Sequence, residues 1–377
     1  MQLVFEEVSY AYASLTETKK PKKSRRFFGK KKEEQAAAEK PAWGNDPAEK
    51  YALHQVSLQL NEGDFLGICG HTGSGKSTLI QHMNGLLTPT EGRVLLDGRD
   101  LSNKDAQKEC RGMVGVVFQY PEHQLFAQSV YDDVAFGPRN LGLSEDEIDA
   151  RVRKALADVR LDFDTISPVS PFELSGGQQR RVAFAGVLAM QPRILVLDEP
   201  AAGLDPAARS SFLSLIKELH EQGLTVVMVS HSMEDLAQLC SRIIVLNQGR
   251  VFAQGTPEQV FSDAEGLKSI GLDVPAAQRV ANKLRARGIA LPGTLYSSAE
   301  QLSADVAKLY RELHGEDAGM DAANQIAAGK QPLAASQAAT GGAGKQPLAD
   351  GAGETAPGNQ AESAKNNSAI NSNESLA

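Results

Sequence analysis

A glycine-rich segment that begins at residue 70 has the composition of a phosphate-binding loop. It reads Gly70-His71-Thr72-Gly73-Ser74-Gly75-Lys76-Ser77 and fits the pattern G-x-x-x-x-G-K-[ST]. In this pattern, backbone N–H groups and the lysine hold the phosphates of a nucleotide, and the serine hydroxyl holds magnesium. We expect Lys76 and the amides of Gly73 to Thr78 to neutralise phosphate charge, aided by the positive end of a helix that begins near Lys76. By itself the motif predicts nucleotide binding without specifying a reaction.

Two neighbouring carboxylates, Asp198 and Glu199, follow the apolar run Ile194 to Leu197. A buried strand that ends here would place both side chains beside the phosphates. Transfer of a phosphoryl group to water requires neutralised charge on the terminal phosphate and an activated water in line with the breaking bond. We expect Asp198 to contact Mg²⁺ and Glu199 to orient or deprotonate the attacking water. In an arbitrary protein, such a pair would more often cap a helix or lie in a surface turn.

Apolar, β-rich runs alternate with amphipathic helical stretches from Tyr51 to about residue 262. The runs are Phe65 to Cys69, Val114 to Phe118, Ile194 to Leu197, Thr225 to Val229 and Ile243 to Leu246. Such alternation predicts an α/β fold, with a largely parallel sheet covered by helices. Gln119 directly follows the second run, so its amide would reach magnesium or the attacking water from the end of a strand.

Composition limits the class of protein. The chain has 377 residues, 41% of them hydrophobic, which is enough for two domains with buried cores. Its formal net charge of −8 argues against a protein that binds nucleic acid over its whole surface. No apolar run approaches the roughly 18 residues of a membrane helix, and the first residues do not resemble a signal peptide. We therefore expect a cytoplasmic protein without a specific nucleic-acid partner.

The three cysteines, Cys69, Cys110 and Cys240, are far apart in the sequence. An odd number at this spacing is typical of reduced, cytosolic proteins rather than of a disulfide framework or a zinc site. Cys69 lies on the apolar run that enters the phosphate loop. We expect it to be a buried and unreactive thiol.

The order of the motifs resembles that of the ATP-binding cassette (ABC) ATPases. Leu174-Ser175-Gly176-Gly177-Gln178 matches the signature motif of that family, and Ala202 to Asp205 matches its D-loop. The resemblance implies a P-loop ABC ATPase core with a mainly parallel sheet, an antiparallel β subdomain and a helical subdomain, plus a small C-terminal helical extension. It also implies that His231 contacts the terminal phosphate of ATP.

The same resemblance implies a site shared between two subunits. Ser175 and the amides of Gly176 and Gly177, at the start of a helix, would form a second anion site. In the family this site, with Gln178 beside it, binds the terminal phosphate of the ATP held by the other subunit, and the D-loop residue Asp205 lies at the seam. An aromatic residue just after the first strand stacks on adenine; Tyr12 is our choice, and Tyr10 is the alternative.

Four segments narrow the family. They are similar to the ATPases of energy-coupling factor (ECF) uptake transporters, most of all to the second of their two non-identical ATPase subunits, and they are Val116 to Phe126, Val134 to Gly142, Gly177 to Met190 and Leu197 to Pro206. The resemblance implies that the chain uses ATP and Mg²⁺ to close a dimer of cassettes and so powers the uptake of vitamins or other micronutrients. Its partners would be a second, similar ATPase subunit, a transmembrane coupling protein and a substrate-binding membrane protein. The chain would be a peripheral protein on the cytoplasmic face of the cell membrane.

Two alternatives remain open at this point. Homodimeric cobalt or nickel uptake ATPases share much of the same sequence, and a soluble ABC protein in translation or DNA repair would share the motifs. Proteins of the soluble class usually carry two cassettes or a long coiled-coil insertion. In ABC ATPases the segment after the glutamine, here Tyr120 to Phe126, contacts the membrane partner, and we expect Glu122 to pair with a basic residue of that partner.

The chain divides by composition into a core, an insert and a tail. We predict an ABC ATPase domain over residues 1–263 with a disordered insert at about 13–50, an accessory or dimerisation region over 264–316, and a disordered tail over 317–377. Helix-like patterns at Pro275 to Arg287 and Ala299 to Leu313 support the accessory region. Within the insert, residues 19–32 hold nine Lys or Arg and no acidic residue. This charge run favours contact with an anionic membrane surface; a solvated loop and an RNA contact are the alternatives.

Overall fold

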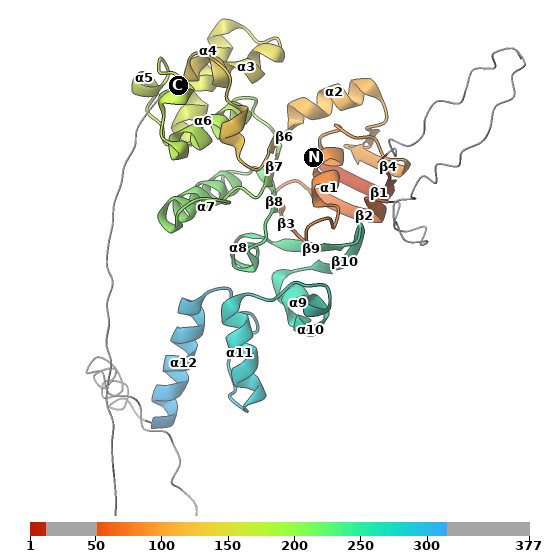
Figure 1. Cartoon of the computed structure of the whole chain (residues 1–377), viewed down its shortest axis with the longest axis vertical. Coiled ribbons are helices and arrows are strands. Elements are labelled where there is room, and N and C mark those ends of the chain that lie inside the picture. Colours follow the sequence, from red (N-terminus) through yellow and green to blue (C-terminus); the bar gives the residue numbers. More distant parts are fainter. Residues whose placement is uncertain (13–50, 315–377) are drawn as a thin grey trace, which may run out of the picture. The chain divides into compact units, whose positions relative to one another are not determined.

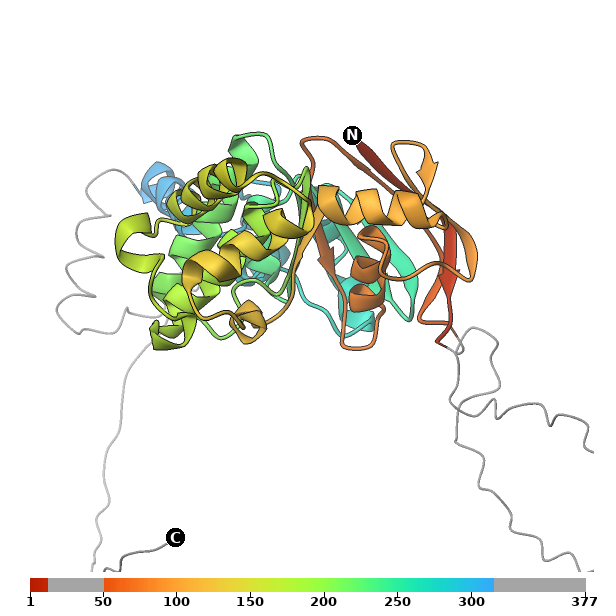
Figure 2. The ribbon, with the colours of Figure 1, turned by 90° about the horizontal axis from the view of Figure 1, so that it is seen from above.

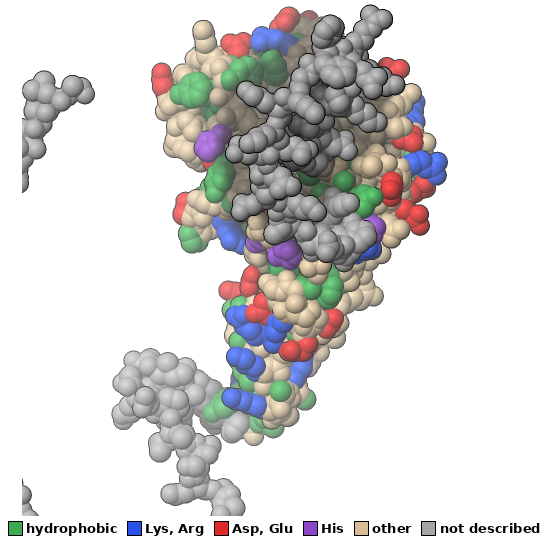
Figure 3. Space-filling model, turned by 45° about the vertical axis from the view of Figure 1, so that its right-hand side comes forward, with side chains coloured by type: hydrophobic (Ala, Val, Ile, Leu, Met, Phe, Trp, Pro, Cys, Tyr) green, Lys and Arg blue, Asp and Glu red, His purple; other side chains and the backbone are tan. Residues whose placement is uncertain are grey.

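The computed structural model describes residues 1–12 and 51–314, and every structural statement below refers to these residues. They all belong to one compact unit, Met1–Met320. The predicted basic insert and disordered tail lie outside the described residues. On the face seen in Figure 3, acidic and basic side chains of the described residues are intermixed.

The core of the fold is a six-stranded sheet with the order β10-β9-β3-β8-β7-β6. Five strands are mutually parallel, and β10 (Arg250–Gly255) pairs antiparallel with the edge of the set. The parallel strands are β3 (Phe65–Cys69), β6 (Val114–Val117), β7 (Ile194–Asp198), β8 (Thr225–Val229) and β9 (Arg242–Asn247). They coincide with the five predicted runs, because strands covered on both faces are apolar throughout. The prediction of a parallel sheet is confirmed.

A second, antiparallel sheet has the order β2-β1-β4-β5. Its strands are β1 (Gln2–Tyr10), β2 (Leu53–Asn61), β4 (Glu91–Leu96) and β5 (Arg99–Asp100). Helix α1 (Lys76–Met83) and the side chains of this sheet share a hydrophobic core with one face of the parallel sheet. Helix α2 (Lys104–Met113) follows, with Asn103 as its N-cap. The antiparallel β subdomain implied by the family resemblance is therefore present.

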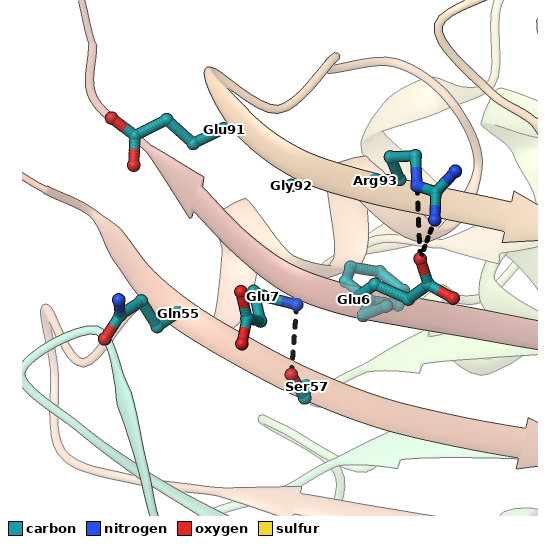
Figure 4. Close-up of a pocket in the computed structure, with 8 residues that line it drawn as sticks. Glu6, Glu7, Gln55, Ser57, Glu91, Gly92 and Arg93 are labelled. Atoms are coloured by element: carbon teal, nitrogen blue, oxygen red, sulfur yellow. Dashed lines mark hydrogen bonds and ion pairs between the residues drawn. The ribbon is translucent and has the colours of Figure 1, made fainter.

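The outer face of the antiparallel sheet is irregular (Figure 4). The register shifts near Glu7, whose φ of 49° lies in the left-handed region, and its N–H donates to the Ser57 hydroxyl at 3.0 Å. On β4, a Cβ atom at Gly92 would lie 2.4 Å from the carbonyl oxygens of Glu6 and Glu7, so only glycine fits there. Irregular pairs of this kind increase the local twist of a sheet. A polar pocket on this sheet is lined by Phe5, Glu6, Glu7, Gln55, Ser57, Glu91, Gly92 and Arg93 (Figure 4).

The other face of the parallel sheet is covered by helices (Figure 1, Figure 2). One group contains α3 (Val130–Asn140), α4 (Glu145–Asp158), α5 (Phe163–Ile166) and α6 (Gly176–Leu188), with the short 3-10 helices η2 (Pro121–Gln124) and η3 (Pro171–Glu173) beside them. This group is the helical subdomain that the resemblance implied. Helices α7 (Pro206–Glu221) and α8 (Met233–Leu239) follow β7 and β8 in the chain. No described helix has the length and apolarity needed to cross a membrane.

Four helices follow the last strand: α9 (Pro257–Ser262), α10 (Ala264–Ser269), α11 (Ala276–Ala286) and α12 (Ala299–His314). The last two match the predicted helical patterns and pack around a small core of Ala277, Ala281, Tyr296 and Leu302. The Glu234 carboxylate of α8 accepts the Ala276 N–H at 2.9 Å and so caps α11 from another element. That the accessory region serves in dimerisation stays a prediction.

Candidate nucleotide-binding site

The phosphate loop connects β3 to α1, as its sequence predicts. Its backbone turns sharply at Gly70, where an added Cβ would lie 2.4 Å from both the Leu246 carbonyl oxygen and the Ser74 hydroxyl. Gly75 is the N-cap of α1 and has a φ of 103°. A Cβ at this position would lie 2.5 Å from the Ala52 carbonyl oxygen. These two contacts explain why the loop requires glycine at both positions.

Lys76 lies across this loop. Its Nζ donates to the carbonyl oxygens of Gly70 at 2.7 Å and His71 at 3.1 Å, and the residue is 9% exposed. Burial lowers the pKa of Lys76, while the nearby carboxylates of Glu199 and Asp198 raise it. No side chain caps the first turn of α1, so its N–H groups are free to receive an anion. The loop therefore presents one cation and a set of backbone donors.

A single cavity unites most of the predicted site residues. It is lined by Tyr12, Ala52, Thr72, Gly73, Gly75, Lys76, Ser77, Thr78, Gln119, Asp198, Glu199 and His231. These residues lie between positions 12 and 231 of the sequence. They meet because β3, β8, β7 and β6 are consecutive parallel strands of one sheet. Gly70, His71 and Ser74 belong to the same loop without lining the cavity. Ala52 was not predicted, and its small side chain after the insert gives no sequence signal.

The two carboxylates lie where β7 ends. Asp198 is the last residue of the strand, and Glu199 follows with a φ of 51° while its N–H donates to the Val229 carbonyl oxygen at 3.0 Å. Burial raises the pKa of both carboxyl groups; for Glu199, the nearby His231 acts in the opposite direction. The buried Oε1 atom of Glu199 has no hydrogen-bond partner among the described residues. An unpartnered carboxylate oxygen beside a polar cavity is suited to accept a proton from water.

The structure distinguishes the two candidate tyrosines. Tyr12 is 56% exposed and forms a wall of the cavity, with its hydroxyl 3.1 Å from Thr78 Oγ1. Tyr10 packs behind it, edge-on to the Tyr12 ring at 5.0 Å and to the His82 ring at 4.9 Å. His82 is buried, and its Nδ1 atom is 2.7 Å from the Thr78 carbonyl oxygen. Tyr10 and His82 thus support the ring of Tyr12 from behind.

The signature residues do not line this cavity. Ser175 is the N-cap of α6, where its hydroxyl accepts the Gln178 N–H and the Gln178 side chain accepts the Ser175 N–H at 3.1 Å. Gly176 and Gly177 are exposed, and an added Cβ on either would meet no atom within 4 Å. Asp205 is likewise exposed and is the N-cap of α7. The start of α6 and Asp205 therefore lie outside the cavity that contains the phosphate loop.

Comparisons with known proteins agree with this geometry. Residues 53–202 match the sequence model of the ABC transporter family. The energy-coupling factor transporter ATP-binding protein EcfA2 of Clostridium tetani is 47% identical over 266 residues, which are 70% of this chain and 92% of that protein.

Two solved structures are also similar. CbiO1 from Clostridium perfringens, part of the ABC transporter complex cbiONQ, has a TM-score of 0.56 and 32% identity, covering 76% of this chain and 98% of that one. The ATP-binding cassette MJ0796, in a dimeric post-hydrolysis state bound to ADP and Pi, has a TM-score of 0.52 and 28% identity, covering 68% and 98%. The predicted fold class is confirmed. The chain belongs to the ABC transporter ATP-binding proteins of the energy-coupling factor type.

Proposed function

We propose that this chain binds and hydrolyses ATP and thereby powers an ECF-type uptake transporter for vitamins or other micronutrients. The observation that carries the proposal is the single cavity in which the phosphate loop, Gln119, the carboxylate pair and His231 meet. These groups match the needs of phosphoryl transfer to water, which are positive charge around the phosphates and a base beside the water. The name of the Clostridium tetani relative, a transporter ATP-binding protein, supports coupling of the reaction to transport.

The walls of the cavity suggest how ATP lies in it. The exposed ring of Tyr12 would stack on adenine, and Lys76 with the first-turn amides of α1 would bind the phosphates. This order places the terminal phosphate toward Glu199 and His231. Glu199 would hold and deprotonate the attacking water through its unpartnered Oε1, and His231 would contact the terminal phosphate from its exposed position.

The oxygen donors in the cavity fit a magnesium ion that is shared with the phosphates. Ser77, Gln119 and Asp198 line the same cavity, and Mg²⁺ prefers oxygen ligands and binds proteins through one or two carboxylates plus substrate phosphates. Bound magnesium would offset the negative charge of the phosphates. Desolvation of the Asp198 carboxylate, which raises its pKa, leaves it in need of such a cation.

The working unit would be a dimer of two cassettes, with a second, similar ATPase subunit as the partner. Ser175, Gly176 and Gly177 lie outside the chain's own cavity and open to solvent, so they can bind the terminal phosphate held by the partner. Asp205 would lie at the seam. The dimeric MJ0796 cassette bound to ADP and Pi supports a dimer. A homodimer, as proposed for the cobalt or nickel alternative, uses the same surfaces.

An exposed aromatic group on the helical side is suited to a membrane partner. The Phe126 and Phe136 side chains are 59% and 49% exposed, and their rings meet edge-on at 4.9 Å. Tyr120 is 41% exposed near them in sequence. An apolar surface of this kind can receive a helix of the transmembrane coupling protein, which would hold the chain on the cytoplasmic face of the membrane.

Glu122 differs from its predicted role. Both of its carboxylate oxygens accept hydrogen bonds from Arg180 of the same chain, each at 3.0 Å. The expectation that Glu122 offers a free carboxylate to a basic partner residue is therefore wrong. Sequence analysis missed this pair because Arg180 lies 58 positions away.

Isolation of the tagged chain from the membranes of its own host tests the proposal. We expect a second ATPase subunit and a transmembrane protein to co-purify, and the purified complex to hydrolyse ATP. A complex with the Lys76→Ala variant is the matched control and should assemble without hydrolysing ATP. Recovery of the chain without any membrane protein would favour the soluble alternative.

A further inference from the structure

Arg180 on α6 joins three parts of the site that are remote in sequence. Its Nε and Nη2 atoms donate to the two carboxylate oxygens of Glu122, each at 3.0 Å, in a bidentate pair. Its Nη1 atom donates to the Ala202 carbonyl oxygen at 2.8 Å. The guanidinium carbon also lies 5.9 Å from the centre of the Tyr120 ring.

Each of these contacts touches a different motif. Glu122 belongs to η2, which begins two residues after Gln119, and Arg180 lies in the second turn of the helix that Ser175 caps. Ala202 is the first residue of the segment that matches the D-loop, Ala202 to Asp205, so the bond to its carbonyl oxygen reaches the D-loop itself. The Tyr120 ring lies near the same segment, since a Cβ added at Gly203 would lie 3.5 Å from it.

Burial restricts the movement of the Arg180–Glu122 pair. The Arg180 side chain is 4% exposed and that of Glu122 is 18% exposed. Burial alone would raise the pKa of Glu122, but the hydrogen bond from Arg180 and smaller contributions outweigh it and lower this pKa. Removing one partner of a buried pair leaves the other charge uncompensated, and a bidentate guanidinium allows little rotation. Movement of η2 must therefore move α6 and the D-loop with it, or break these bonds.

We propose that Arg180 is a positioning residue that couples the chain's own ATP site to the site completed in the partner subunit. Gln119 belongs to the first site, and Ser175 and Asp205 belong to the second. Displacement of Gln119 by nucleotide would pass through Glu122 and Arg180 to the start of α6 and to the D-loop. This inference rests on the proposed function and assigns a regulatory contact to the same pair of sites.

Conservative substitutions in the purified transporter complex test this role. Arg180→Lys keeps the charge and loses the bidentate geometry, whereas Glu122→Gln keeps the shape and loses the charge. Arg181→Lys is the matched control, because Arg181 is the next residue of the same helix and donates to Val159 O at 2.8 Å and Ser211 Oγ at 3.1 Å, away from the motifs. The measurements are kcat and KM for ATP, the melting temperature, and the kcat of the double variant.

We expect kcat to fall about tenfold or more in Arg180→Lys and Glu122→Gln, as for small misplacements of reacting groups. The KM for ATP should stay within about twofold, and Arg181→Lys should keep kcat within about twofold while lowering the melting temperature as much as Arg180→Lys does. The kcat of the double variant should be no lower than that of the more impaired single variant, since both substitutions act through the same contact.

Two results would overturn the proposal. One is an equal loss of kcat in Arg181→Lys, which would indicate general disturbance of α6. The other is additive losses in the double variant, which would show that the two residues act separately. A wild-type complex without ATPase activity would instead refute the proposed function itself, so the two failures are distinguishable.

Discussion

His231 contacts the Glu199 carboxylate from two directions. Its backbone N–H donates to Glu199 Oε2 at 3.4 Å, and its ring Nε2 lies 3.3 Å from Oε1 without hydrogen-bond geometry. The first contact fixes the rotamer of Glu199 through the backbone. The second places the exposed imidazole beside Oε1, which is itself buried. The arrangement orients the carboxylate without consuming its free acceptor.

Loss of the Glu199 carboxylate should therefore stop turnover and spare binding. In Glu199→Gln we expect ATP binding close to that of the unmodified chain and a kcat that is lower by about 10²-fold or more, because the water loses its base. Lys76→Ala should instead weaken nucleotide binding, since it removes the cation within the loop. Calorimetric binding and steady-state ATPase assays on the complex separate these effects. Near-normal turnover in Glu199→Gln would refute the assignment.

The same substitution should stabilise the nucleotide-free fold at neutral pH. Burial raises the folded-state pKa of Glu199, so the folded protein binds more protons than the unfolded chain in the window between the two pKa values. Stability is therefore lost as the pH rises through this window, and the full penalty is present above it. We expect Glu199→Gln to melt about 1–2 °C higher at pH 7.5, after allowance for solvent that reaches the cavity.

Thermal unfolding of both proteins between pH 8 and pH 5 measures this effect. The difference in melting temperature between Glu199→Gln and the unmodified chain should shrink as the pH falls toward the ordinary pKa of a glutamate side chain. A difference that grows on acidification would contradict the sign of the shift.

ATPase activity of the isolated chain should depend on its concentration. Each ATP would need the phosphate loop of one cassette and the open start of α6 of another, so a lone chain offers half of each site. We expect Ser175→Arg to suppress activity at all concentrations, because a bulky cation would fill the start of α6. Full activity in a preparation shown to be monomeric by light scattering would rule out the shared site.

An exposed phenylalanine should matter for transport more than for nucleotide binding. Phe126→Asp places a charge on the aromatic surface at which we expect the membrane partner, while leaving the cavity unchanged. Uptake in cells should fall at least about tenfold, the loss expected for a central apolar contact of an interface. Phe252→Asp, on β10 and 39% exposed, is the control for an exposed ring elsewhere. Equal uptake by both variants would exclude this surface as the contact.

The thiols should be inert in the folded protein. All three cysteines are buried and free, whereas the sequence predicts burial only for Cys69. Burial raises the pKa of Cys69 and Cys110 to about 12 and that of Cys240 well above its usual value. The thiolate is the reactive form, so an aromatic disulfide reagent at pH 8 should modify no thiol of the native chain and all three after denaturation. Rapid modification of the native chain would contradict this burial.

The sequence by itself determined the parallel sheet and the presence of the ABC ATPase motifs. Strands that are buried on both faces appear in the sequence as continuous apolar runs. The phosphate loop needs glycine at Gly70 and Gly75 because a side chain at either position would clash with neighbouring atoms. The signature segment and its capping residue Ser175 are equally local. These features depend on neighbours in sequence, so a single sequence can reveal them.

Only the tertiary structure decided which residues meet. The sequence favoured Tyr12 over Tyr10 without excluding either, and the structure shows that Tyr12 lines the cavity whereas Tyr10 packs against His82. Glu122 looked free until the fold placed Arg180 beside it. Pairing of distant side chains depends on the course of the backbone between them, which leaves no local periodicity. Which distant side chain such a residue contacts is therefore decided by the packing of the fold.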